Sequence, residues 1–202
     1  TAFREAFAAT LPPGIEIEFD GEYVSMYSYK MKNYALLSAD GEMIIKGAAL
    51  KSRGLERYQR EFLREMIRMK LEGREDALPA LRQRYDDAIA RRNWSVDAFS
   101  KTENLQTSPD AYAANRSKGK GSRRAAYELA LAASREYKMG DQVAYYVTGE
   151  KKNVAVHENS KLVSDWDPDH RDENTAYYRA KLDALYTKLG GPEGDARQGE
   201  LF

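Results

Sequence analysis

The order of apolar and polar residues divides the first half of the chain into a sheet-like and a helix-like part. Between residues 15 and 47 the two kinds of residue alternate, and the sequence is rich in tyrosine, isoleucine and valine. Asp-Gly pairs at 20–21 and 40–41 stand where hairpin turns belong. This pattern predicts a small antiparallel sheet of three or four strands.

Helical spacing follows the alternating part. Apolar residues three or four positions apart predict one helix over about 55–71, ended by Gly73, and a second helix over 76–91. The remaining predicted elements are a helix over 125–137, a strand over 141–149 with a candidate partner strand at 154–158, and a last helix over 175–189 that begins after polar capping residues.

Residues 92–122 show little periodicity and predict a mostly irregular connection, so we expect a subdomain boundary near residue 100. The expected fold class is α+β, with a small antiparallel sheet followed by a mostly helical part that contains a short β-hairpin. The expected division of the chain is 1–100, 101–190 and a flexible tail at 191–202.

Composition narrows the classes of protein that remain. The 202 residues include no cysteine, which excludes disulfides and thiolate metal sites. No apolar run approaches the roughly 20 residues of a membrane span, so the sequence predicts a cytoplasmic protein with no membrane partner. The numbers of basic and acidic residues are equal, at 32 each. That balance argues against a uniformly basic binder of nucleic acid.

The charges are nevertheless unevenly distributed. Basic residues dominate 46–70 and 116–138, whereas acidic residues dominate from Asp165 onward. In the stretch 116–124, glycines stand between cations, so the backbone can approach a polyanion closely. A solvated surface loop explains the same composition equally well. The basic residues of this stretch are Arg116, Lys118, Lys120, Arg123 and Arg124.

Tyrosines and lysines alternate in the predicted sheet. Tyr27, Tyr29 and Tyr34 are interleaved with Lys30 and Lys32. They fit either an amphipathic strand or a surface for bases and phosphates. Spacing alone favours packing within the strand.

Several kinds of catalytic or binding site are excluded by the sequence. Only two histidines occur, and neither stands near a cysteine or a nucleophile elbow. The acidic run DWDPDH starts like a calcium loop, but His170 replaces the glycine of the sixth position and Ala176 the glutamate of the twelfth. Glycine-rich phosphate loops are also absent from the sequence.

The order of these segments resembles family B DNA polymerases, at the end of the palm and in the thumb. There a Lys-x-Tyr element on a strand precedes a Lys-Gly hairpin and a long helix. Here the two elements are Lys32-Asn33-Tyr34 and Lys46-Gly47. The run GDQVAYYVTG and the later WDPDHRDENTAYYRAKLDALYTKL are similar to the closing thumb segment. Asn33 departs from the family, which often has a basic residue there.

The resemblance implies a role in gripping the newly made primer–template duplex. Lys32 and Tyr34 would contact the minor-groove side or backbone, and the other cations would contact phosphates, so sequence preference would be weak. The DNA-binding residues implied in this way are Lys30, Lys32, Tyr34, Lys46, Lys51, Arg53, Arg116, Lys118, Lys120, Arg123 and Arg124.

The resemblance also sets what is expected of catalysis. Family members hold magnesium ions with aspartates, two of them in a Tyr-Gly-Asp-Thr-Asp turn that this sequence lacks. We therefore expect a C-terminal fragment or subunit that has no cofactor, is inactive alone, and works with an upstream catalytic palm and fingers. The alternative is a non-catalytic DNA-binding or clamp-associated accessory protein. A generic helical interaction domain is a more remote third possibility.

The sequence closes on Gln-Gly-Glu-Leu-Phe, which resembles the bacterial motif for binding a sliding clamp. Gln198, Leu201 and Phe202 would occupy the clamp, and tethering would compensate for the modest affinity of a short peptide. This likeness predicts a bacterial source, a DNA polymerase II-like protein and a nucleoid-associated place in the cytoplasm. It leaves open whether the polymerase serves replication or repair.

Overall fold

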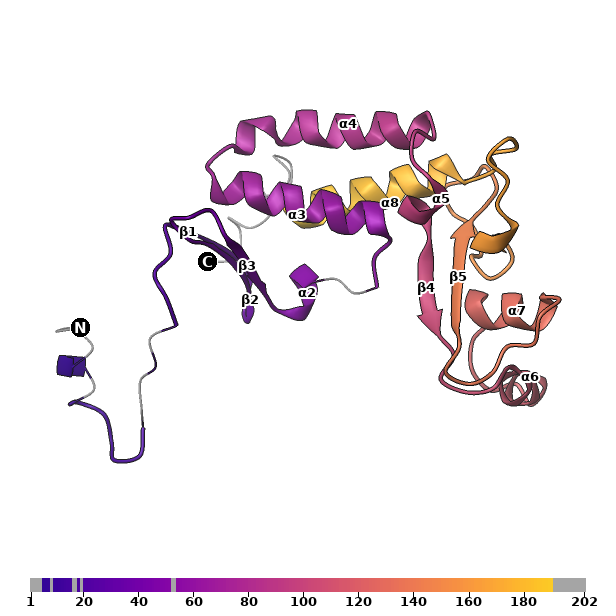
Figure 1. The fold of residues 1–202 in the computed structure, drawn as a ribbon, viewed down its shortest axis with the longest axis horizontal. Helices are drawn as coiled ribbons and strands as arrows, with labels where there is room; N and C mark the ends of the chain where they lie inside the picture. Colours follow the sequence, from indigo (N-terminus) through magenta and orange to yellow (C-terminus); the bar gives the residue numbers. More distant parts are fainter. Residues whose placement is uncertain (1–4, 8, 16–17, 19, 52–53, 191–202) are drawn as a thin grey trace.

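Two three-stranded antiparallel sheets lie toward opposite ends of a layer of helices in the computed structural model, which describes residues 5–7, 9–15, 18, 20–51 and 54–190 (Figure 1). The arrangement confirms the α+β class. The first sheet has the order β1 (Ser25–Lys30), β2 (Asn33–Leu37), β3 (Met43–Lys46), and the second β4 (Lys101–Asn104), β5 (Gln142–Val147), β6 (Ser160–Leu162). The α-helices are α2 (Ala48–Lys51), α3 (Arg57–Leu71), α4 (Leu78–Ala90), α5 (Val96–Phe99), α6 (Pro109–Ser117), α7 (Ala125–Ala132) and α8 (Thr175–Lys188), and the 3-10 turns are η1 (Glu75–Ala77) and η2 (Val163–Asp165).

The first sheet packs one face against α3. Its inward side chains include Tyr29, Ala35 and Met43, all buried in the main core. The turn predicted at 40–41 is confirmed, because it joins β2 to β3. The hairpin turn predicted at 20–21 stays a prediction, because residues 16, 17 and 19 of its expected first strand lie outside the described residues. The residues that are described before Ser25 include no strand.

Three helices form the central layer, which we call the helical layer: α3, α4 and α8 lie side by side (Figure 1). Their facing side chains, among them Phe62, Met66 and Leu182, are almost completely buried. The predicted helices of this layer are confirmed to within a few residues. Gly73 follows α3 with a φ of 69°, a conformation that glycine adopts without strain and that ends a helix.

Residues 101–162, here called the second lobe, pack around their own core. Tyr112 and Tyr127 stack with ring centroids 4.5 Å apart beneath the second sheet. Three predictions for this part are wrong. The helix expected over 125–137 ends at Ala132, β5 pairs with β4 and β6 instead of 154–158, and the stretch 92–122 holds α5, β4 and α6. A Ser-Pro cap starts α6, since the hydroxyl of Ser108 accepts the N–H of Ala111.

The main core crosses the expected division of the chain. Tyr178 and Leu182 of α8 are buried with residues of α3, α4 and α5. The last helix therefore packs with the first half of the sequence. The boundary at residue 100 and the tail at 191–202 stay predictions.

Candidate nucleic-acid interface

The turn between β1 and β2 lies against the turn between β3 and α2. A Cβ atom at Gly47 would stand 2.2 Å from the carbonyl oxygen of Lys32, and the φ of Gly47 is 92°. Any other residue would collide with the Lys32 backbone and would also be strained. Glycine at this position therefore lets the Lys-Gly turn touch the Lys-x-Tyr turn.

Asn33 fixes this contact. Its Oδ1 accepts the N–H of Ala49 at 2.8 Å, and its Nδ2 donates to the carbonyl of Met31 at 2.9 Å. The first bond satisfies a donor at the start of α2, where helix N–H groups lack partners within the helix. In the sequence, Asn33 stands out only as a departure from the family pattern. In the structure it connects the two turns.

These contacts gather five of the proposed DNA-binding residues at one end of the first sheet. Lys30 pairs with Asn33 in the register of β1 and β2, and Tyr34 pairs with Lys46 in that of β2 and β3. The four lysines are exposed, and within the described part of the chain none of them makes an ion pair. We call the following residues the hairpin cluster: Lys30, Lys32, Tyr34, Lys46 and Lys51.

The three tyrosines of this region have different surroundings. Tyr29 is buried against α3 and Tyr27 is half-buried there, with its hydroxyl donating to the carbonyl of Leu189 at 3.0 Å. Tyr34 is half-buried in the same sheet. It is next to the inward-facing Ala35, so its side chain lies on the opposite face of the sheet. Packing within the strand is therefore confirmed for Tyr27 and Tyr29, and Tyr34 stays a candidate for DNA contact.

The second basic group, the loop cluster, consists of Arg116 in the last turn of α6 and of Lys118, Lys120, Arg123 and Arg124, which lie between α6 and α7. Arg123 makes ion pairs with Glu128 and Glu158, and Arg124 pairs with Glu103 at 3.2 Å. These carboxylates partly compensate both guanidinium charges. Lys118 and Lys120 are exposed, and no ion pair to either is found among the described residues.

Arg123 and Arg124 line a cavity of about 240 Å³ between the second lobe and the start of α3. Lys101 and His157 line it too, although neither was predicted from the sequence to be a binding residue. Burial raises the pKa of Glu56 in this cavity above its ordinary 4.5. Burial opposes ionisation of Glu103 as well, but the hydroxyl of Tyr145 and the nearby Lys101 and Arg124 lower its pKa overall.

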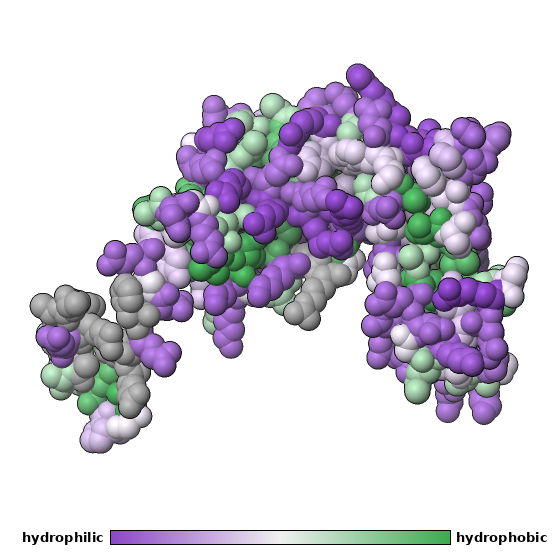
Figure 2. All heavy atoms as spheres, in the orientation of Figure 1, coloured by the Kyte–Doolittle hydropathy of each residue, from purple (hydrophilic) through white to green (hydrophobic). Residues whose placement is uncertain are grey.

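The two clusters lie on opposite sides of a hollow. Figure 2 shows the molecular surface hollowed beneath α3, between the first sheet with α2 and the second lobe, with hydrophilic side chains along both borders. Lys51 belongs to α2 on one side, and the loop cluster belongs to the other. A polyanion lying in this hollow could contact cations from both parts of the chain.

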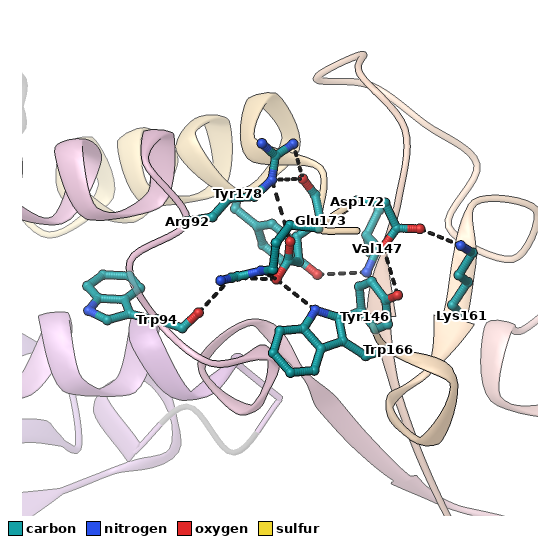
Figure 3. Close-up of polar contacts among 10 residues, drawn as sticks. Arg92, Trp94, Tyr146, Val147, Lys161, Trp166, Asp172, Glu173 and Tyr178 are labelled. Atoms are coloured by element: carbon teal, nitrogen blue, oxygen red, sulfur yellow. Dashed lines mark hydrogen bonds and ion pairs between the residues drawn. The ribbon is translucent and has the colours of Figure 1, made fainter. Parts of the chain in front are cut away.

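A buried ionic network joins the second lobe to the helical layer (Figure 3). Glu173 is completely buried and accepts hydrogen bonds from Trp166 Nε1 at 3.0 Å and Arg171 Nη2 at 2.7 Å. Its other oxygen lies 3.4 Å from Arg92 Nε, close enough for an ion pair but not aligned for a hydrogen bond. The paired charges therefore hold the segment before α8 against the end of α4.

The neighbours of Glu173 extend the same connection. Asp172 accepts the hydroxyl of Tyr146 at 2.8 Å and pairs with Lys161, both in the second sheet. Asn174 caps α8 by accepting the N–H of Tyr177 at 2.9 Å. We call residues 172–174 the joint, because they bond to the second sheet, the helical layer and the start of α8.

Four residues named from the sequence lie outside the described part of the chain, namely Arg53, Gln198, Leu201 and Phe202. The described residues contain no cluster of three or more histidine, aspartate or glutamate side chains that could hold a metal ion. None of the described helices has the length and apolar character needed to span a membrane.

The fold is similar to that of a known class of protein. The chain is similar in structure to the family B DNA polymerase from the hyperthermophilic archaeon Pyrobaculum calidifontis, with a TM-score of 0.69, 18% sequence identity, and coverage of 88% of this chain and 22% of that one. The family profile of DNA polymerase family B matches residues 3–187. The chain belongs to DNA polymerase family B. No curated protein matches it.

Proposed function

We propose that this chain is the part of a family B DNA polymerase that grips the primer–template duplex behind the active site. The observation that carries the proposal is that the two parts of the chain on opposite sides of one hollow, the first sheet with α2 and the second lobe, each carry exposed lysines, in a chain of this family. Lysines that contact phosphates position a duplex without reading its sequence. The chain spans only 22% of the length of the archaeal polymerase. That it belongs to a protein with the activity of a whole polymerase is therefore itself proposed.

Mutation of the two lysine groups tests this function. We expect K32A/K46A and K118A/K120A each to weaken duplex binding several-fold in low salt, because each lysine that pairs with a phosphate releases counterions. The control K152A/K188A removes two exposed lysines that belong to neither cluster and should change affinity little. Equal losses in all three variants would show that binding follows overall charge and not the hollow.

Catalysis is assigned to another part of the polymerase. The carboxylates of the described residues form no group of three or more that could hold a magnesium ion. In the proposed polymerase, the metal-binding aspartates would lie in an upstream catalytic palm, and this chain would work with that palm and with the fingers. The isolated chain should incorporate no nucleotide into a primed template, and incorporation by a pure sample would contradict this assignment.

A sliding clamp is the second proposed partner, and it rests on the sequence alone. Gln198, Leu201 and Phe202 match a clamp-binding pattern typical of bacteria, in keeping with a DNA polymerase II-like protein that acts near the nucleoid. Deletion of residues 198–202 should abolish binding to a bacterial clamp ring and leave duplex binding unchanged. Clamp binding that survives the deletion would remove this part of the proposal.

A further inference from the structure

Strand β1 is an uncovered edge of the first sheet. The sheet has the order β1-β2-β3, and the described part of the chain places no strand on the outer side of β1. Figure 1 shows the described residues 5–15 lying apart from the sheet, so they do not cover this edge either. An uncovered edge presents unpaired N–H and C=O groups that can bond to another strand.

Two residues of β1 carry these unpaired groups. In an antiparallel pair, successive residues direct their backbone groups alternately toward and away from the partner strand. The carbonyl oxygen of Leu37 accepts the N–H of Val24 at 2.8 Å, so Leu37 directs its backbone groups toward β1. Ser25 lies opposite Leu37 and therefore bonds to β2. Met26 and Ser28 are one and three residues further on, so their N–H and C=O groups point to the uncovered side.

The side chains of β1 do not protect this edge. Charged side chains within an edge strand are one of the ways in which proteins prevent it from pairing. No charged residue stands between Glu22 and Lys30, the last residue of β1. Val24 and Met26 are instead apolar, and they are 66% and 60% exposed. The edge is therefore suited to contact with a second strand.

Charges of opposite sign flank β1. Asp20 and Glu22 precede the strand, Lys30 ends it and Lys32 follows it. All four side chains are exposed, and no ion pair to any of them is found among the residues that the structure describes. Two copies of β1 that pair in antiparallel fashion place the acidic end of each copy beside the basic end of the other. Parallel pairing would place like charges together, so the charges select the antiparallel arrangement.

A second copy of the chain fits this edge better than a nucleic acid does. Phosphates accept hydrogen bonds but offer no donor to the carbonyl oxygens of Met26 and Ser28, and Asp20 and Glu22 repel them. A second β1 supplies both donors and acceptors, together with complementary charges at its ends. Contacts in which two copies use the same surface are also the commonest form of self-association.

We propose that two copies of this chain pair through β1, so that two three-stranded sheets become one continuous sheet of six strands. The backbone of Met26 in each copy bonds to Ser28 of the other, and the side chains of Val24 and Met26 from both copies meet on one face. A contact through one strand of each copy is smaller than the roughly 1,200 Å² that stable complexes bury, so the dimer is weak.

The dimer also covers part of the proposed DNA site. Lys30 and Lys32 belong to the hairpin cluster, and in the dimer they lie beside Asp20 and Glu22 of the other copy. Lysines that pair with these carboxylates are not free to pair with phosphates, so duplex binding and self-association oppose each other to the same degree. This consequence rests on the proposed function, whereas the dimer itself does not.

The test is sedimentation velocity of the full chain in low salt, from micromolar to near-millimolar concentrations, where we expect a monomer–dimer equilibrium. D20K/E22K makes both ends of β1 basic and K30E/K32E makes both ends acidic, so each variant should dimerise at least about tenfold more weakly. An equal mixture of the two variants should dimerise again, because the basic ends of one meet the acidic ends of the other.

Two further measurements locate the contact. The control E136K/E150K changes the net charge by the same amount as D20K/E22K, at exposed positions outside β1, and should alter dimerisation by less than about twofold. Hydrogen exchange of the unmodified chain should show the amides of Met26 and Ser28 becoming protected as the concentration rises. Circular dichroism verifies that the variants are folded.

The proposal is overturned if the chain stays monomeric at every concentration, if D20K/E22K dimerises like the control, or if the mixture does not recover. Protection of the Met26 and Ser28 amides at every concentration would also overturn it, because another segment of the same chain would then cover the edge. Added duplex should release monomers, and a dimer that duplex leaves intact would contradict the opposition between the two. A dimer of a chain that binds no duplex would refute only the proposed function.

Discussion

At the scale of single residues, the arrangement of the hairpin cluster depends on two uncharged residues, Gly47 and Asn33. Gly47 allows two turns to touch, and Asn33 bonds one turn to the helix that follows the other. Neither residue is charged, so neither can form an ion pair with a DNA phosphate. Their role is to bring Lys32 and Lys46, which are distant in sequence, to the same end of the sheet.

Replacing Gly47 with alanine should lower the free energy of unfolding by about 2–3 kcal/mol, through strain at positive φ and collision with the Lys32 carbonyl. Gly41 is a matched control, because its φ is 83° and a Cβ atom there meets nothing within 4 Å. G41A should cost only about 1 kcal/mol. Chemical denaturation measures both, and equal losses would mean that the contact with Lys32 contributes nothing.

Glu56 gives the molecule a specific dependence on pH. Because burial raises its pKa in the folded state above 4.5, the fold prefers the protonated form. Its contribution to stability is fully present below pH 4.5 and is lost as the pH rises through the raised pKa. Glutamine at this position cannot ionise and can still accept hydrogen bonds at the helix start.

The unfolding free energy of E56Q should therefore increase relative to the unmodified chain as the pH rises from 4.5 toward neutrality. The variant E136Q changes an exposed glutamate and serves as the control. Urea denaturation at a series of pH values measures the difference. Parallel profiles for E56Q and the unmodified chain would contradict the role of burial.

At the scale of elements, the joint sets how the second lobe meets the helical layer. Glu173 lies between Arg171 and Arg92, whose side chains are 25% and 35% exposed. Removing the carboxylate leaves two partly buried guanidinium groups without their partner. Loss of a partner from a buried ion pair is costly because the remaining charge is not well solvated.

E173A should therefore lower the free energy of unfolding by about 2–3 kcal/mol, less than for a fully buried pair because both arginines reach solvent. E150A, at an exposed position, should change it by less than about 0.5 kcal/mol. Both tryptophans of the chain, Trp94 and Trp166, bond within this network, so their fluorescence reports it directly. Indistinguishable stabilities for the two variants would contradict a structural role of the joint.

Helices with long apolar stripes could be predicted from the sequence, whereas short elements could not. The stripe of α3 repeats over four turns, so its spacing is unambiguous. Of the two partners of β5, the one that follows it in the sequence is the three-residue strand Ser160–Leu162, which is too short to show alternation. Whether such a short segment forms a strand depends on its tertiary pairing and not on its own sequence pattern. The prediction of 154–158 as the partner strand was wrong for that reason.

The candidate site was predictable to the same limited degree. The sequence showed that the loop cluster is basic, but Arg124 pairs with Glu103, 21 residues away, and Arg123 with Glu158, 35 residues away. Such distant pairs leave no local pattern. The sequence therefore overstated the free charge of these arginines, and it also missed Lys101, His157 and the bonding of Asn33.

At the scale of the whole molecule, the hollow is formed by parts far apart in the sequence. The first sheet supplies one border, the second lobe supplies the other, and α3 lies above (Figures 1 and 2). Both parts carry lysines without ion pairs among the described residues, although basic and acidic residues balance over the full sequence. Local charge, and not net charge, therefore suits this face to a polyanion.

The most direct test is the salt dependence of binding to a labelled primer–template duplex, followed by fluorescence anisotropy at increasing concentrations of potassium chloride. We expect the logarithm of the association constant to fall linearly with the logarithm of salt, with a slope that K32A/K46A makes shallower by about two units. Duplexes of unrelated sequence should behave alike. Equal affinity in low and high salt, or a slope that the variant leaves unchanged, would contradict the proposal that this chain grips duplex DNA through the hollow.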